Sequence, residues 1–217
     1  MMNRSVLLWA ALFGTFFLLA PQVARAADNP LKDPSFESRL SPDQGGWNLF
    51  EYSTFSSDQA RTGEQSMFHW GFSRTVPFPA FLDGRASGSY QELPAEPGSR
   101  WRLTGFGTTP IALEGTPAFG IVQVSFFDSR GKDLGTAETA GSTTTRAKIS
   151  NEINSQTPAG EWVFLDTGVA TAPEGTATIQ AFTLFVDYSG TGISQGVYFD
   201  DLKLCALGDD GHESDCD

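Results

Sequence analysis

The sequence is short of the residues that build covalent or metal-linked cores. Its 217 residues include two cysteines and two histidines, with no C-x-x-C motif and no histidine cluster, which excludes the common zinc and redox motifs. Cys205 and Cys216 lie close together in the sequence, and in an oxidising compartment we expect them to form a disulfide. Such a bond would enclose only the acidic tail, residues 205–217, so apolar packing must hold the rest of the fold.

Basic residues are also scarce. The chain has 14 Lys and Arg against 26 Asp and Glu, a formal net charge of −12. Nucleic acids and anionic membrane surfaces both require a basic patch, so neither is expected as a partner. An acidic surface suits a soluble exported protein and is compatible with cation binding.

Only one stretch is long and apolar. Val6–Ala20 follows the basic residue Arg4 and precedes the motif Ala24-Arg25-Ala26. These features are typical of a secretory signal peptide with an A-x-A cleavage site, and the run is shorter than the roughly 20 apolar residues of a membrane span, which is the alternative. We therefore expect removal of residues 1–26, no membrane insertion, and a secreted protein, periplasmic or extracellular. Cleavage would remove two arginines and no acid, taking the formal charge from −12 to −14.

Helical periodicity is almost absent, and strand patterns take its place. Apolar and aromatic runs with partial alternation are separated by Gly- and Pro-rich turns, which predicts many short strands. A short strand near Leu31–Phe36 is expected to precede them, and only Arg146–Asn154 could form a short helix. We expect an all-β fold, a two-sheet antiparallel β-sandwich of the jelly-roll kind in one domain, residues 27–204, with the first and last strands adjacent. The predicted strands are Trp47–Phe55, Gln65–Trp70, Gly88–Leu93, Trp101–Thr108, Gly120–Asp128, Trp162–Ala170, Thr178–Val186 and Val197–Leu204.

Several short motifs, in order, resemble a known family. The opening Asn29–Glu37 followed by Trp47, and the closing Val197–Leu204, are similar to the first and last motifs of galactose-binding-like jelly rolls. This family includes carbohydrate-binding modules of families four, nine and twenty-two. Three further motifs between them fit the same order: Arg61–Met67, Trp101–Phe106 and Val124–Gly131. The resemblance runs from Asn29 to Leu204, and two inserts, residues 72–85 and 136–154, depart from it.

The resemblance implies a structural calcium ion between the first and last strands. Its ligands would be Glu37, Asp200 or Asp201, and the backbone around Gly63–Gln65, and oxygen ligands of this kind suit Ca²⁺. Two adjacent aspartates at the start of a final strand leave one of them pointing inward, where a metal would stabilise it. The alternative is a hydrogen-bonded pair without a metal.

Aromatic residues cluster where strand 65–70 leads into the insert 72–85. Sugars present flat C–H faces that stack on rings, and guanidinium groups can bond sugar hydroxyls. The resemblance and this composition together predict a carbohydrate site, and the acidic body favours a neutral polysaccharide. In the alternative, the prolines fold the insert back and its phenylalanines pack as a satellite core. The predicted ligand-binding residues are Trp70, Phe72, Arg74, Phe78, Phe81 and Arg85.

The favoured function is therefore a secreted, non-catalytic protein similar to a carbohydrate-binding module. The first alternative is a structural, matrix or surface-interaction protein built on the same sandwich, since this fold carries many functions. A weaker alternative is a polysaccharide lyase or glycosidase, because glycoside cleavage needs two carboxylates across a sugar cleft. No spacing selects such a pair among Glu92, Asp128, Glu161 and Asp187, and His69 is expected to be a hydrogen-bonded strand residue rather than a base.

Overall fold

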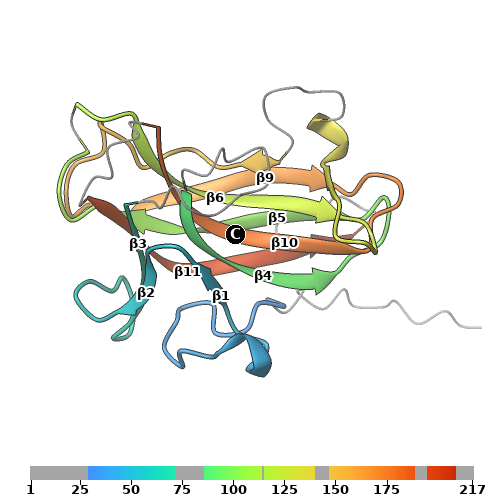
Figure 1. The fold of residues 1–217 in the computed structure, drawn as a ribbon, viewed down its shortest axis with the longest axis horizontal. Coiled ribbons are helices and arrows are strands. Elements are labelled where there is room, and N and C mark those ends of the chain that lie inside the picture. The colour runs from blue at the N-terminus through green and yellow to red at the C-terminus, as the bar shows by residue number, and fades with distance from the viewer. Residues whose placement is uncertain (1–28, 72–85, 114, 140–146, 189–194, 209–217) are drawn as a thin grey trace, which may run out of the picture.

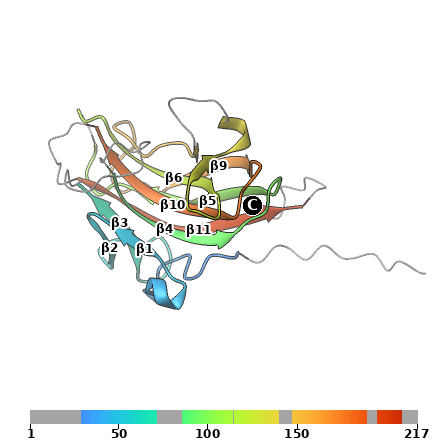
Figure 2. The same ribbon diagram turned by 45° about the vertical axis from the view of Figure 1, so that its right-hand side comes forward.

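The protein is an antiparallel β-sandwich, as predicted. The structure, a computed structural model, describes residues 29–71, 86–113, 115–139, 147–188 and 195–208. Over these residues two sheets lie face to face, and the only helical elements are two single-turn 3₁₀ helices, η1 (Pro42–Gln44) and η2 (Ala137–Thr139) (Figures 1 and 2).

The first sheet, called sheet A, is built around a long central strand. Its order is β1-β4-β10-β6-β7, and β8 also pairs with β6. Strand β10 pairs along its length with β4 on one side and β6 on the other. The bounds are β1 (Asn48–Phe50), β4 (Ala86–Pro94), β6 (Ala118–Phe127), β7 (Asp133–Gly135), β8 (Lys148–Ile149) and β10 (Thr178–Asp187).

The second sheet, called sheet B, has the last strand at its centre. Its order is β2-β3-β11-β5-β9. Strand β11 pairs with β3 and β5, and its register shifts between Asp200 and Lys203. The bounds are β2 (Ser53–Ser56), β3 (Ser66–Trp70), β5 (Arg100–Thr108), β9 (Val163–Thr171) and β11 (Gly196–Leu207).

The main core lies between the two sheets. Alternate residues of each strand point into it, because successive side chains of a strand face opposite sides. Burying each large apolar side chain contributes about 1.5–3 kcal/mol, so the core needs no cross-link. Its largest fully buried members include Trp47, Phe36, Phe126, Phe185 and Phe199.

A small polar group interrupts this core. His69 of β3 is fully buried, and its Nε2 lies 2.7 Å from the Thr183 hydroxyl of β10, which in turn lies 2.6 Å from the Ser89 hydroxyl of β4. The contact joins the two sheets. Burial lowers the pKa of His69 to about 3, and Nδ1 has no hydrogen-bond partner. His69 is thus an interior residue of a strand, as predicted, and remains neutral at ordinary pH.

The N-terminal part differs from the prediction. Leu31–Phe36 forms turns rather than a strand, although Pro34 O accepts a hydrogen bond of 2.9 Å from Leu202 N of β11. The predicted strand Trp47–Phe55 is broken at Glu51, whose φ of 52° turns the chain from β1 in sheet A to β2 in sheet B. The prediction that the first and last strands are adjacent is therefore wrong, since β1 pairs with β4 and β11 lies in the other sheet.

Arg146–Asn154, which the sequence allowed as a short helix, is not helical in the part that the structure describes. Residues 147–153 are extended: β8 pairs with β6, and Ile153 forms a bridge with Gly120. Ile153 is fully buried in the main core, and this burial fixes the segment along the edge of β6. The polar segment thus widens sheet A by one edge strand.

The described residues contain no helix long and apolar enough to cross a membrane.

Candidate functional site

The outer face of sheet A carries a second apolar cluster. In β10, Phe182, Leu184 and Val186 point away from the main core, while Ala181 and Phe185 point into it. The rings of Tyr90, Phe50 and Phe119 are half-buried against this cluster. Its buried members are Ala86, Ile121, Phe127, Phe182, Leu184 and Val186.

Two buried polar atoms on this face lack a partner. Gln123 of β6 pairs in register with Phe182 and is 2% exposed, yet its Nε2 makes no hydrogen bond. Asp133 of β7 pairs with Phe127, and its Oδ2 is also buried and unpaired, while its Oδ1 accepts hydrogen bonds from the Ser125 hydroxyl (2.7 Å) and Gly135 N (2.8 Å). An unpaired buried polar group costs about 1–3 kcal/mol, so each of these atoms calls for an explanation.

The rim of the same face is polar and more exposed. Gln180 of β10 donates a 2.7 Å hydrogen bond through Nε2 to Glu92 of β4, and Glu92 is exposed. The Tyr90 ring centroid lies 5.5 Å from that of Phe182 and 6.5 Å from that of Phe50. A donor, an acceptor and aromatic rings thus share one surface, which is the pattern of a small-molecule site.

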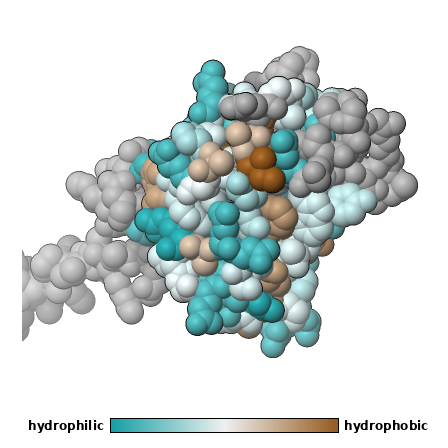
Figure 3. Space-filling model, turned by 90° about the vertical axis from the view of Figure 1, so that its left-hand side faces the viewer, coloured by the Kyte–Doolittle hydropathy of each residue, from teal (hydrophilic) through white to brown (hydrophobic). Residues whose placement is uncertain are grey.

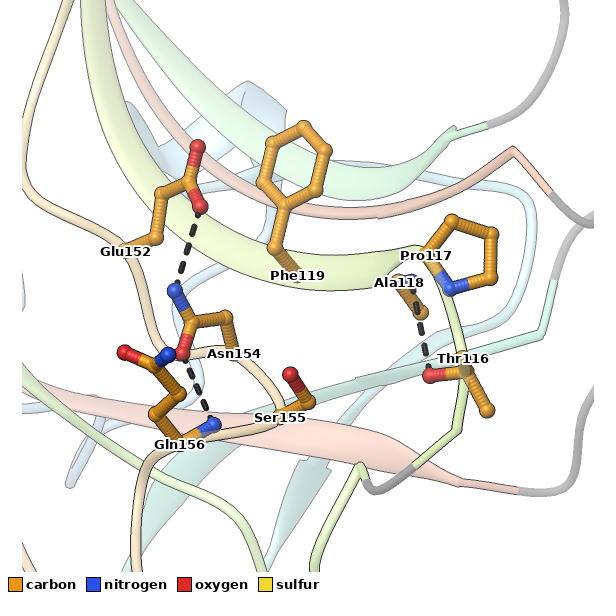
Figure 4. A pocket seen from close by; sticks show the side chains of 8 residues that line it. All are labelled: Thr116, Pro117, Ala118, Phe119, Glu152, Asn154, Ser155 and Gln156. Atoms are coloured by element: carbon orange, nitrogen blue, oxygen red, sulfur yellow. Dashed lines mark hydrogen bonds between the residues drawn. The ribbon is translucent and has the colours of Figure 1, made fainter.

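A pocket of about 270 Å³ opens beside this face. It lies between the start of β6 and the segment 152–156, and Figure 4 shows the Phe119 ring beside the side chains of Glu152 and Asn154. Asn154 Nδ2 donates to Glu152 Oε2 at 3.3 Å, and Gln156 N donates to Asn154 Oδ1 at 3.0 Å. Phe119 also contacts Tyr188, which is 46% exposed, with ring centroids 5.8 Å apart.

The outer face of sheet B is aromatic as well, and it contains Trp70. The Trp70 ring stacks on Phe68 with centroids 5.2 Å apart and lies 5.9 Å from Tyr52, and Phe68 stacks on Tyr198 at 4.2 Å. These rings contact one another, and Trp70 is half-buried. At this end of the molecule, hydrophobic residues are scattered among hydrophilic ones (Figure 3).

The predicted carbohydrate residues fall mostly outside the described part of the chain. Trp70 is described, and the other five, Phe72, Arg74, Phe78, Phe81 and Arg85, are not. Described residues on either side of residues 72–85 contact each other, because the Ser87 hydroxyl donates to both Trp70 O (3.0 Å) and Gly71 O (2.9 Å). The assignment of Trp70 to a ligand site stays a prediction.

Glu37, one of the predicted calcium ligands, holds one end of loop 61–65. Glu37 Oε1 accepts hydrogen bonds from Glu64 N (3.1 Å) and Gln65 N (2.9 Å). Gly63 has a φ of 62°, and a Cβ there would lie 2.3 Å from Glu37 Oε1, so only glycine fits against this carboxylate.

The closing aspartates hold the other end of the same loop. Asp200 is fully buried, and its Oδ2 accepts hydrogen bonds from Arg61 N (2.7 Å) and Thr62 N (3.2 Å). Asp200 Oδ1 accepts a further bond from Asp201 N (2.8 Å), and burial raises the pKa of Asp200 to about 6. Asp201 has a φ of 49°, and its Oδ2 accepts a hydrogen bond of 2.6 Å from Arg61 Nη1.

These groups, as they lie, fit N–H donors rather than a cation. Calcium takes six to eight oxygen ligands, whereas loop 61–65 turns amide hydrogens toward Glu37 and Asp200. Within the described ranges, no group of three or more His, Cys, Asp or Glu side chains could hold a metal. In the structure, the carboxylates of Glu37 and Asp200 thus accept hydrogen bonds from backbone N–H groups, as the metal-free alternative expects. The calcium site stays a prediction.

The carboxylates considered for glycoside cleavage lie in four separate places. Glu92 bonds Gln180 on sheet A, Asp187 is fully buried, and Glu161 is exposed before β9. Asp128 accepts bonds from Arg130 N and Lys132 N, both 2.9 Å, and the latter bond is the main reason that its pKa is lowered. Asp128 therefore stabilises a turn.

Cys205 is fully buried on β11, and Cys216 lies outside the described residues. The predicted disulfide stays a prediction.

Solved structures share this architecture. No protein-family profile and no curated protein sequence matches the chain. The C-terminal family 22 carbohydrate-binding module of Clostridium thermocellum Xyn10B has a TM-score of 0.50 at 14% identity, covering 81% of this chain and 92% of that module. The chain has the jelly-roll fold of a carbohydrate-binding module. This confirms the resemblance predicted from its motifs, at the level of fold.

The same jelly roll occurs within larger proteins. An arabinose-bound α-L-arabinofuranosidase has a TM-score of 0.52 at 12% identity over 86% of this chain and 27% of that protein. The enzymatically active domain of tailspike protein 4 from bacteriophage CBA120 has a TM-score of 0.50 at 15% identity over 82% of this chain and 21% of that one. The chain thus spans only about a fifth to a quarter of these two proteins.

The residues that carry the outer face of sheet A were not predicted. Gln123 and Ser125 interrupt the apolar run Phe119–Phe127, and polar residues at alternate positions of such a run are a signal that sequence reasoning could have used. Asp133 gives no such signal, because its place on the face depends on the pairing of β7 with β6.

Proposed function

We propose that this chain is a secreted, non-catalytic protein that binds a glycan on the outer face of sheet A. The observation that carries the proposal is that two buried atoms on this face, Gln123 Nε2 and Asp133 Oδ2, have no hydrogen-bond partner. Phe182 lies between Gln123 and the half-buried ring of Tyr90, and Asp133 lies further away, on β7. A sugar hydroxyl both donates and accepts, so one glycan could complete both atoms while a sugar face packs against a ring.

The charge of the protein favours a neutral glycan. The formal net charge is −12, and Asp133 and Glu92 add two carboxylates to the site itself. An anionic sugar would meet like charges there, whereas a neutral one would supply hydroxyl donors to the same oxygens.

Xylan is the first ligand to try. The structure called the xylan-binding domain from family 22, at 14% identity and a TM-score of 0.50, covers 81% of this chain. This likeness concerns the fold alone, so the first experiment should compare several neutral oligosaccharides. Isothermal titration with xylohexaose, cellohexaose and mannohexaose, and a wider glycan array, would do so with the full secreted protein.

Two variants distinguish the two candidate positions on the sandwich. Gln123→Leu should weaken binding tenfold or more if the outer face of sheet A is the site. Trp70→Ala should abolish it if the sequence-based prediction at the end of β3 holds, and the half-exposed ring of Trp70 keeps that position accessible. If the wild-type protein binds none of the array, the structural or surface-interaction alternative takes its place.

A further inference from the structure

We infer that the pocket between Phe119 and Glu152 is a subsite for one uncharged sugar unit, a specificity-determining extension of the glycan site. This inference rests on the proposed function. The pocket is contiguous with the outer face of sheet A, because Phe119 forms part of its wall and also packs against the apolar cluster of that face.

The size and lining of the pocket suit a single sugar ring. Ligand pockets for larger molecules span about 300–1,000 Å³, and this pocket, of about 270 Å³, has room for a sugar unit. Phe119 offers an aromatic wall for a C–H face. Glu152 offers a carboxylate whose Oε1 accepts no bond from the described residues, and the side-chain amide of Gln156 is likewise without a described partner.

The polar wall is fixed in place before any ligand arrives. Ile153 is fully buried and exchanges two backbone hydrogen bonds with Gly120 of β6, of 2.8 and 2.9 Å. Asn154 is held by the Thr157 hydroxyl at its backbone N (3.1 Å) and by Gln156 N at its Oδ1, and it in turn orients Glu152. A wall ordered in this way loses little conformational freedom on binding.

The charge of the pocket determines which sugars it accepts. Among the described residues that line it there is one carboxylate, Glu152, and no basic residue. A hydroxyl can donate to that carboxylate, and a charge-assisted hydrogen bond of this kind is about twice as strong as a neutral one. A uronic acid would instead place a second carboxylate beside Glu152. The pocket therefore selects neutral units over acidic ones of the same size.

The test compares neutral and acidic oligosaccharides by isothermal titration. The probes are the neutral hexasaccharide that wild type binds best and hexagalacturonate. We expect Phe119→Ala and Glu152→Gln each to weaken binding of the neutral probe at least fivefold. Glu152→Gln should also narrow the preference for the neutral probe over hexagalacturonate, because the like charge is gone. Phe164→Ala is the matched control, since this ring is 45% exposed on the opposite sheet, and it should leave both affinities unchanged.

The outcomes separate this inference from the proposed function. Glu152 is exposed, so Glu152→Gln should fold. Unchanged affinity and an unchanged preference in this variant overturn the subsite even if Phe119→Ala fails to fold. In that case a loss of binding in Gln123→Leu still supports the glycan site. If wild type binds no neutral oligosaccharide, the proposed function itself fails.

Discussion

The two outer faces of the sandwich carry similar residue types but use their polar groups differently. On sheet B the charged side chains are paired: Arg102 bonds Asp166 through two nitrogens, at 2.9 and 2.7 Å, and Arg61 bonds Asp201 while lying 3.4 Å from the Phe106 ring centre. On sheet A, a buried amide nitrogen and a buried carboxylate oxygen have no partner. Pairing within the protein indicates a structural role. Sheet B also carries a buried polar atom without a partner, Thr108 Oγ1, so binding by variants of both faces has to be compared.

The largest expected loss of stability is at Asp200 on sheet B. Asp200→Ala removes the acceptor of three backbone N–H groups, and each buried unpaired group costs about 1–3 kcal/mol, so the free energy of unfolding should fall by about 3 kcal/mol. Urea denaturation measures this. Asp201→Ala, whose ion pair is partly exposed, should cost about 1 kcal/mol or less. Equal, small losses in both variants would contradict a structural role for Asp200.

A calcium ion at Asp200 would add a second contribution to the free energy of unfolding. A ligand that binds only the folded protein stabilises it by about 2.7 kcal/mol at a hundredfold excess over its Kd. The calcium prediction therefore expects a chelator to lower the Tm of wild type and to leave the Tm of Asp200→Ala unchanged. A wild-type Tm that does not move, with no metal found by elemental analysis, would leave the N–H groups of loop 61–65 as the partners of Asp200.

The burial of His69 between the two sheets predicts a pH dependence of stability. The pKa of His69 is lowered to about 3 by burial, below its usual value near 6.5, so the unfolded chain binds a proton that the folded one does not. Stability from neutral His69 is present above pH 6.5 and is lost as pH falls, by about 1.4 kcal/mol per pH unit. His69→Gln, which does not titrate, should lack this slope. Parallel stability curves of the two proteins between pH 6.5 and pH 4 would contradict the assignment.

One pair of variants tests the comparison of the two faces directly. Gln123→Leu on sheet A and Thr108→Val on sheet B each remove a buried polar group without a partner, so both should raise the free energy of unfolding by about 1–2 kcal/mol. Only Gln123→Leu should weaken glycan binding, tenfold or more. A loss of binding in Thr108→Val would assign the ligand to sheet B instead.

The smallest expected effect on stability is at the partly exposed ion pair of Arg102 and Asp166. The hydrogen bonds from Arg102 are the main reason that the pKa of Asp166 is lowered. The ionised carboxylate therefore stabilises the folded protein above pH 4, and this contribution is lost as the pH falls further. Asp166→Asn should cost at most about 1 kcal/mol at pH 7, because the pair is partly exposed. In thermal denaturation, the difference between wild type and variant should shrink as the pH falls below 4.

The sequence predicted the strands better than the site. Alternating apolar residues gave eight strands, because that pattern is local. Glu51 was missed, since nothing in the polar stretch around it marks a residue with positive φ. The site depends on register: Gln123 lies beside Phe182 only because β6 and β10 pair over a separation of about sixty residues. Alternation in one strand gives no information on that pairing.

The contacts of the Ser87 hydroxyl with Trp70 O and Gly71 O have a consequence for how this fold can diversify. They hold the described residues before and after positions 72–85 together, where β3 of sheet B is followed by β4 of sheet A. Doubling the length of a flexible loop between fixed ends adds only about 0.6 kcal/mol. The sandwich can therefore accept segments of other lengths and compositions there without rearranging its core, and a library of grafted loops at this junction is a practical route to new binding specificities.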